Sequence, residues 1–165
     1  MKVRQVESGD QGTARDVPPG LLDIALDTRS LFERLLALSE ISSTAGTCLH
    51  ACILVCSCIK AFLPQQQALI RGGDGCGDGG FLDANGVIHG HYWVECNVGS
   101  DRWIVDISAD QFGSEAPLVL PYAMAHQYIP GDQGVVDRHV RDEVQTMAQP
   151  SLPIAEDSNG ARIAS

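Results

Sequence analysis

The sequence predicts an α+β fold in which a central, cysteine-bearing helix packs on an antiparallel sheet. An apolar run of helical length follows Gly46–Thr47 and stops at Pro64. Two segments rich in β-branched and aromatic residues, 87–98 and 102–108, flank a glycine-containing turn. The chain of 165 residues is 44% hydrophobic, which is typical of a globular protein with a single core.

The charge balance excludes some classes of partner. Eleven basic and twenty-one acidic residues give a net charge of −10. This charge repels phosphate backbones and anionic lipid surfaces, so we expect neither nucleic acid nor membrane as a partner. The N-terminal MKVRQVESGD lacks the apolar core of a secretory signal, and no segment reaches the roughly eighteen apolar residues of a membrane span. We therefore expect a cytoplasmic protein.

Composition divides the chain into three parts. Residues 1–19 are polar and end in prolines, which predicts a flexible N-terminal arm. Residues 20–148 form the single expected domain. The polar tail, residues 149–165, is predicted to be disordered.

The first expected helix lies within 21–40, where leucines and other apolar residues recur at helical spacing. Asp27, Thr28 or Ser30 could cap a helix running through 31–39. A scaffold role is the plain interpretation of this helix.

The second expected helix is the apolar run that starts near Gly46–Thr47. Ser42, Ser43 and Thr44 are candidate caps, and Pro64 ends it. Because the run is apolar on nearly all sides, the helix should be buried centrally. A third helix is expected over 135–148.

Between the helices and the strands lies RGGDGCGDGG, residues 71–80, with six glycines in ten. Such a composition predicts a flexible loop, either a plain surface connection or a lid beside a site. A turn at 83–86 follows, and then the strand over 87–98.

The two predicted strands should pair as a hairpin, and its loop decides which side chains share a face. A two-residue loop at Val98–Gly99 places His91 opposite Asp106. A loop at Gly99–Ser100 shifts the partner by two and leaves the pair diagonal. Either even loop keeps both side chains on one face, whereas an odd loop separates them.

Six cysteines are present, and four lie between 48 and 58. Residues at i, i+4 and i+8 share one helix face but are too far apart along the axis to bridge easily. We expect most of these thiols to be reduced and buried. A zinc or redox role is the alternative, although Cys56-x-Cys58 lacks the usual spacer. No metal or other cofactor is required.

Three residues could carry out chemistry together. Cys48 would lie in the first turn of the central helix, where free N–H groups and the helix dipole favour a thiolate. Those N–H groups could also hold an oxyanion. A nucleophilic cysteine needs a base and an orienting group, and His91 and Asp106 are suitably placed. Cys52 and Cys56, deeper in the helix, should be inert.

The order GTC, HYWVE and WIVDIS resembles the transglutaminase-like branch of the papain-type cysteine enzymes. This resemblance, which spans roughly 44–113, implies Cys48 as nucleophile, His91 as general base and acid, and Asp106 as orienter. It implies a helix packed on an antiparallel sheet, no cofactor, and a protein or peptide substrate cleaved, deamidated or transferred at an amide. The chain lacks the calcium-type acidic cluster of larger transglutaminases, which disfavours cross-linking.

Several alternatives stay open. The related arylamine N-acetyltransferases carry R-G-G-x-C, which RGGDGC nearly matches, so Cys76 is a second candidate nucleophile. His89 and His91 could hold a metal with Glu95, although Glu95 more plausibly pairs with Arg102 across the hairpin. A non-catalytic protein-binding module on the same scaffold is the alternative function. Bystander roles are expected for His50 and His89. Gln111 is either a plain polar residue after a strand, which we favour, or a contact to the substrate or the oxyanion.

Overall fold

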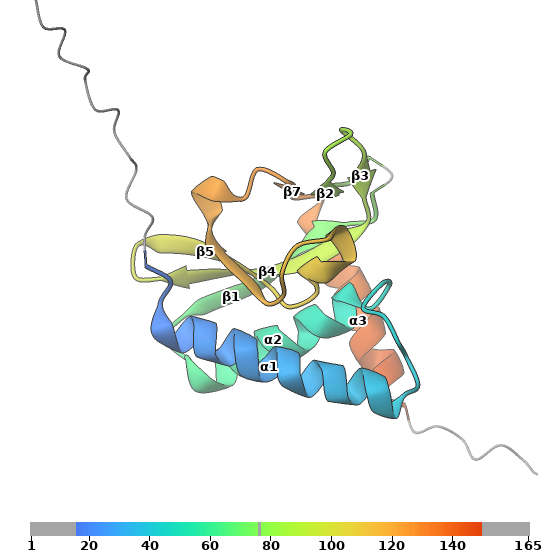
Figure 1. Ribbon diagram of the computed structural model, residues 1–165, viewed down its shortest axis with the longest axis horizontal. Helices are drawn as coiled ribbons and strands as arrows, with labels where there is room; N and C mark the ends of the chain where they lie inside the picture. Colours follow the sequence, from blue (N-terminus) through green and yellow to red (C-terminus); the bar gives the residue numbers. More distant parts are fainter. Residues whose placement is uncertain (1–15, 76, 150–165) are drawn as a thin grey trace, which may run out of the picture.

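The computed structural model describes residues 16–75 and 77–149. Its described part is α+β, with an antiparallel sheet beside three α-helices, which confirms the expected coarse fold class (Figure 1). The helices are α1 (Pro19–Leu38), α2 (Cys48–Phe62) and α3 (Gln133–Ala148).

The strands form two sheets. The larger has the order β1-β4-β5-β6 and the smaller the order β3-β2-β7, and all pairings are antiparallel. The strand bounds are β1 Gln67–Gly73, β2 Gly80–Leu82, β3 Ile88–His89, β4 His91–Val98, β5 Asp101–Asp106, β6 Leu118–Pro121 and β7 Tyr128–Ile129. Short 3₁₀ turns, η1 (Ala109–Phe112) and η2 (Tyr122–Met124), follow β5 and β6.

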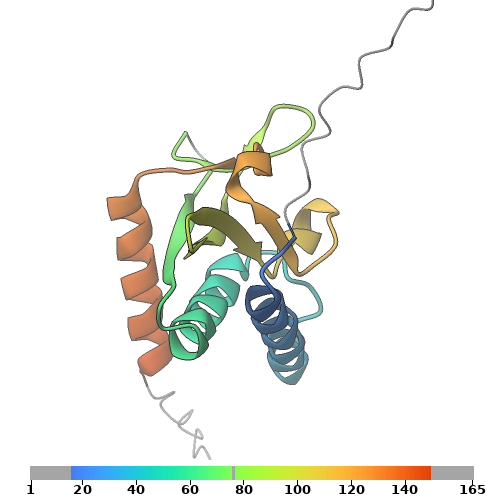
Figure 2. The same cartoon turned by 90° about the vertical axis from the view of Figure 1, so that its left-hand side faces the viewer.

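The helices lie on one side of the larger sheet and the smaller sheet lies on the other. Figure 2 shows α1 and α2 beneath the larger sheet and α3 beside them, along β1. The main core joins α1 and α2 to the sheet face that carries Val94, Cys96 and Val105. A second cluster lies on the opposite face, around Trp93 and Ile104. Both tryptophans, Trp93 and Trp103, are buried in the core.

Helix α1 begins earlier than predicted. It starts at Pro19, in the first-turn position where proline's fixed φ suits a helix and its missing N–H costs nothing. Thr28, a candidate cap, instead lies buried inside the helix. The predicted arm over 1–19 is therefore one residue too long; of that arm, residues 1–15 lie outside the described residues, as does most of the predicted tail, 150–165.

Helix α2 begins at Cys48, with Thr47 as its N-cap. The expected caps Ser42, Ser43 and Thr44 do not cap it. The Thr47 hydroxyl donates to the carbonyl of Thr44 at 2.7 Å, and no side chain in the described chain accepts from the first-turn N–H groups. The helix is buried centrally, as predicted, because it packs on both β1 and β4.

The prediction of a flexible glycine loop over 71–80 is wrong at both ends. Arg71, Gly72 and Gly73 belong to β1 and pair with β4, and Gly80 belongs to β2. At Gly72 (φ +146°) a side chain would collide with the His91 backbone, and at Gly80 (φ +131°) with the His89 backbone. These glycines allow backbones to approach closely, so their composition reflects packing rather than flexibility.

The predicted strand over 87–98 is also divided. Gly90 separates β3 from β4, and the two pieces belong to different sheets. The β4–β5 hairpin turns at Gly99–Ser100, because Val98 pairs with Asp101 and Gly99 adopts φ +62°. The even loop with diagonal placement is thus the one adopted. Strand β5 ends at Asp106, two residues before the predicted end.

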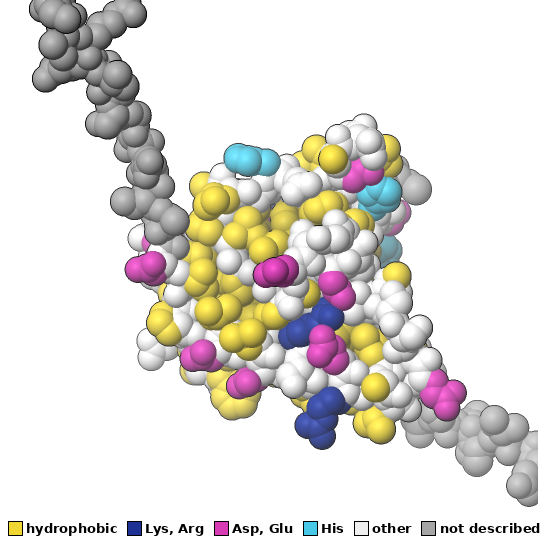
Figure 3. Space-filling view, in the orientation of Figure 1, with side chains coloured by type: hydrophobic (Ala, Val, Ile, Leu, Met, Phe, Trp, Pro, Cys, Tyr) yellow, Lys and Arg dark blue, Asp and Glu magenta, His cyan; other side chains and the backbone are white. Residues whose placement is uncertain are grey.

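The surface retains apolar side chains on α1. Leu26, Leu31 and Leu35 are each more than two-fifths exposed, and Figure 3 shows hydrophobic side chains spread over this face of the molecule. None of the helices in residues 16–75 and 77–149 combines the length and apolar character needed to cross a bilayer.

Candidate active site

The structure brings His91, the first residue of β4, into direct contact with Asp106, the last residue of β5. Nε2 of His91 lies 2.7 Å from Oδ2 of Asp106, and the two side chains are 0% and 1% exposed. A short hydrogen bond between buried charged groups is stronger than one at the surface. With Asp106 ionised, Nε2–H donates to the carboxylate.

Both oxygens of the Asp106 carboxylate are held. Oδ1 accepts from the backbone N–H of Ser108 at 2.9 Å and from its hydroxyl at 3.0 Å. Oδ2 accepts from the hydroxyl of Tyr128 at 3.0 Å as well as from His91. These contacts offset the cost of burying the carboxylate and fix its rotation.

Cys48 is the other group that acts on the imidazole. It lies at the first position of α2 and is 7% exposed. Nδ1 of His91 makes no hydrogen bond of regular geometry to the described residues. Since Nε2 is engaged by Asp106, Nδ1 is the ring nitrogen left to interact with the thiol.

The electrostatics of the imidazole connect all three residues. Burial lowers the pKa of His91, but the hydrogen bond that the ring donates to Asp106 and the interaction with Cys48 outweigh it and raise the pKa to about 9. The ring is therefore an imidazolium near neutral pH. A protonated histidine beside a cysteine favours the thiolate, the nucleophilic form of sulfur.

Aromatic rings enclose the imidazole. Phe112 meets it edge-on at 4.9 Å between centroids, and Phe81 does so at 6.2 Å. Tyr128 and Trp93 lie at 6.1 and 6.3 Å. This shell excludes water and strengthens the ion pair inside it.

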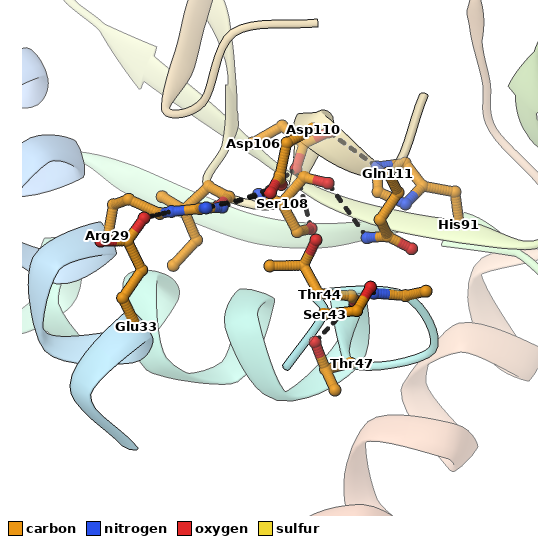
Figure 4. A network of polar contacts seen from close by, with 12 residues as sticks. Arg29, Glu33, Ser43, Thr44, Thr47, His91, Asp106, Ser108, Asp110 and Gln111 are labelled. Atoms are coloured by element: carbon orange, nitrogen blue, oxygen red, sulfur yellow. Dashed lines mark hydrogen bonds and ion pairs between the residues drawn. The ribbon is translucent and has the colours of Figure 1, made fainter. Parts of the chain in front are cut away.

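The segment after β5 is tied to α1 and to the turn before α2. The guanidinium of Arg29 binds both carboxylate oxygens of Asp110, at 2.9 and 3.0 Å, and donates to the carbonyl of Ile107 at 2.6 Å. Asp110 also accepts from Thr44. Figure 4 shows this network beside His91 and Asp106.

A polar cavity of about 480 Å³ opens at this network, next to the turn that leads to Cys48. Its lining includes Arg29, Glu33, Ser43, Thr44, Asp110 and Gln111.

Tyr92 lies on the opposite face of β4 from His91. Its hydroxyl is 2.6 Å from Nδ1 of His139 on α3. Burial, and then the nearby Cys48, raise the pKa of Tyr92 to about 12. Cys48 therefore influences the pKa of both His91 and Tyr92, which are neighbours on β4.

The remaining cysteines fit the expected structural role. Cys52, Cys56 and Cys96 are buried free thiols, and Cys58 is half-buried. Burial raises the pKa of Cys52 and of Cys56, which disfavours their thiolates. Cys76 lies outside the described residues, so the alternative nucleophile remains a prediction.

His50 and His89 each have a separate acidic partner. Nε2 of His50 is 2.8 Å from Glu143 on α3, and Nε2 of His89 is 2.9 Å from Asp83. His89 belongs to β3 rather than β4, so it does not share a continuous strand with His91, contrary to the prediction. In the described parts of the chain, no group of three His, Cys, Asp or Glu side chains could hold a metal.

The structure also gives the partners of Glu95 and Gln111. Glu95 pairs with Arg102, as predicted, at 3.5 Å, and also with Arg71 at 3.6 Å. Gln111 donates to the carbonyl of Ser108 at 3.0 Å and lines the polar cavity.

Ser108 and Tyr128 are the site residues that the sequence did not indicate. The spacing Asp106-x-Ser108 is a signal for a side chain that accepts from the backbone two residues later, so Ser108 could have been found. Tyr128 carries no such local signal, because a pairing between distant segments brings β7 to the site.

No family model, curated protein or solved structure matches this chain. The site must be interpreted from its own geometry.

Proposed function

We propose that the protein is a cysteine-dependent acyl-transfer enzyme that acts on an amide or peptide bond. The observation that carries the proposal is the buried His91–Asp106 pair, 2.7 Å apart, whose remaining ring nitrogen is left to Cys48 at the start of α2. A buried imidazolium held by a carboxylate beside a thiol is the arrangement that activates a cysteine nucleophile.

The proposed first step divides into bond making and bond breaking. The Cys48 thiolate attacks the carbonyl carbon of the substrate amide and forms a C–S bond. The C–N bond then breaks as the His91 imidazolium gives its proton to the leaving amine. A thioester remains on Cys48.

The second step returns the enzyme to its starting state. Water or a second amine attacks the thioester, and neutral His91 takes the proton of that nucleophile. The thiolate leaves, and the product is an acid or a new amide. Peptidase, deamidase and amide-transferase activities share this scheme and differ in the amine released and the acceptor.

The start of α2 supports the negative charge that develops on the carbonyl oxygen. Its first-turn N–H groups donate to no capping side chain within the described residues, so they can donate to an oxyanion. The polar cavity is lined by Ser43, Thr44 and Ala45 of the turn that precedes α2, and we infer that the substrate enters there.

The same residues support a transglutaminase-like, papain-type relationship. The order Cys48, His91, Asp106 along the chain, on a helix and two adjacent antiparallel strands, is what the resemblance implies.

A non-catalytic binding module is the second candidate, and one observation favours it. His91 and Asp106 are almost fully buried and Cys48 is only 7% exposed, so the site is closed in this conformation. A closed site suits a scaffold that retains the residues without the reaction.

Selective alkylation distinguishes the two candidates. We expect low concentrations of iodoacetamide at pH 7, followed by peptide mapping, to modify Cys48 faster than Cys58, although Cys58 is the more exposed thiol. His91→Gln should abolish this preference while leaving Cys58 labelling unchanged. Labelling that follows exposure alone, with Cys58 first, would contradict the enzymatic proposal.

A further inference from the structure

Tyr128 reaches the proposed site from the smaller sheet. It lies on β7, where it pairs with Phe81 of β2, and it is 6% exposed. Its hydroxyl donates to Oδ2 of Asp106 at 3.0 Å. The same oxygen accepts from Nε2 of His91 at 2.7 Å.

The ring of Tyr128 is held rigidly. It meets the ring of Trp93 edge-on at 5.1 Å and that of Phe81 at 5.5 Å. Such packing leaves the hydroxyl one direction in which to point, toward the carboxylate. The packing of the ring therefore fixes the hydrogen bond between Tyr128 and Asp106.

We propose that Tyr128 is a positioning residue for Asp106, and that its hydroxyl sets how tightly the carboxylate holds the imidazolium of His91. The inference deepens the proposed function and rests on it for its consequence at Cys48. The Tyr128 hydroxyl donates to Asp106, so Tyr128 acts through the carboxylate.

The direction of the effect follows from competition for one oxygen. A hydrogen bond to a carboxylate stabilises its charged form and makes it a weaker acceptor for another donor. Without the Tyr128 hydroxyl, Oδ2 carries more negative charge toward His91. The imidazolium then holds its proton more tightly and gives it less readily to a leaving amine.

The smaller sheet therefore does more than cover the site, because it positions the Tyr128 hydroxyl. Strand β7 exists only through pairing with β2, and β2 pairs with β3, so this sheet delivers the hydroxyl. On the other oxygen, Ser108 belongs to the turn after β5. Two separate segments thus fix the two oxygens of one carboxylate.

Tyr128→Phe tests the proposal because it removes only the hydroxyl. We expect the pKa of His91, measured by NMR titration of the ring nitrogens in the full chain, to rise by about one pH unit. Tyr122→Phe is the matched control, because the Tyr122 ring lies against Arg102 rather than Asp106. The control should leave the titration unchanged.

A second variant covers the case in which Tyr128→Phe does not fold. Placing 3,5-difluorotyrosine at position 128 keeps the ring and makes the hydroxyl a stronger donor, so the pKa of His91 should fall. Opposite shifts in the two variants support the proposal. A His91 titration identical to that of the unmodified chain in either folded variant overturns it.

The titration of His91 tests the role of Tyr128 independently of the proposed enzymatic function. The titration needs no reactive thiol, so Tyr128 can govern His91 even if Cys48 proves unreactive. Conversely, preferential labelling of Cys48 together with an unchanged pKa of His91 in Tyr128→Phe would support the proposed enzymatic function and contradict the positioning role of Tyr128.

Discussion

The backbone of Gly72 on β1 lies against the backbone of His91 and Tyr92 on β4, with no room for a side chain between them. A methyl group at Gly72 would lie 2.8 Å from Cα of Tyr92 and would collide with the carbonyl of His91. Gly72 also adopts φ +146°, which other residues rarely do. The position of the imidazole therefore depends on a glycine in the neighbouring strand.

Gly72→Ala should consequently destabilise the fold strongly. We expect a loss of about 3 kcal/mol, because backbone overlap and the positive φ add, and a fall in Tm of about 10 °C. Gly86→Ala is the control: φ is +80° there, but the space around it is open, so its loss should be about 1 kcal/mol. Equal losses in thermal unfolding would contradict this account of β1.

Asp106→Asn tests the orienting role. The amide keeps the size of the side chain but removes the charge that stabilises the imidazolium of His91. The rate of Cys48 alkylation at pH 7 should fall by about 10²-fold or more, while the far-UV circular dichroism spectrum stays unchanged. Asp110→Asn is the control, because it makes the same change at a carboxylate outside the His91–Asp106 pair. Its rate of Cys48 alkylation should stay within about twofold of that of the unmodified chain. A rate in Asp106→Asn equal to that of the unmodified chain would remove Asp106 from the site.

Local sequence signals explain which parts of this site could be predicted. Helix α2 could be predicted because Thr47 and Pro64 flank an apolar run of helical length. The shared face of His91 and Asp106 followed from hairpin parity, which depends only on whether the loop is even. Both are properties of contiguous sequence.

The elements that escaped prediction depend on distant segments. Strand β1 ends in Arg71-Gly72-Gly73, and glycine composition alone does not distinguish a flexible loop from a strand pressed against another backbone. Strand β7 has two residues, and only its pairing with β2 defines it. Tyr128 was missed for this reason, since nothing near it in the sequence refers to Asp106.

The stability of the fold should depend on pH through His91. Its pKa in the folded protein, about 9, lies above the ordinary 6.5. The ion pair therefore contributes stability that is fully present below pH 6.5 and is lost as the pH rises through 9. The difference corresponds to about 3 kcal/mol.

Urea unfolding between pH 6 and pH 10, under reducing conditions, measures this dependence. His91→Gln is the control, because its side chain carries no charge at any pH in that range. As the pH rises from 6 to 10, the free energy of unfolding of the unmodified chain should fall relative to that of His91→Gln. Parallel stability curves would show that His91 is not an imidazolium in the folded state.

Arg29 should stabilise the turn after β5 mainly through Asp110. The guanidinium binds both oxygens of that carboxylate, a geometry that lysine cannot reproduce. We expect Arg29→Lys to cost about 1–2 kcal/mol and a double-mutant cycle with Asp110→Asn to give a coupling of about 1 kcal/mol, reduced by salt. The cycle of Arg29 with Glu33, an exposed pair one helical turn apart, should give only a few tenths.

The same variants separate stability from reactivity. Asp106 is held by Ser108 and Tyr128, not by Arg29, so Arg29→Lys should change the rate of Cys48 alkylation by less than about twofold. A coupling for Glu33 as large as that for Asp110 would contradict the assigned partner. A large loss of Cys48 labelling in a folded Arg29→Lys variant would instead mean that the turn after β5 governs the thiol directly, through Thr44 and the start of α2.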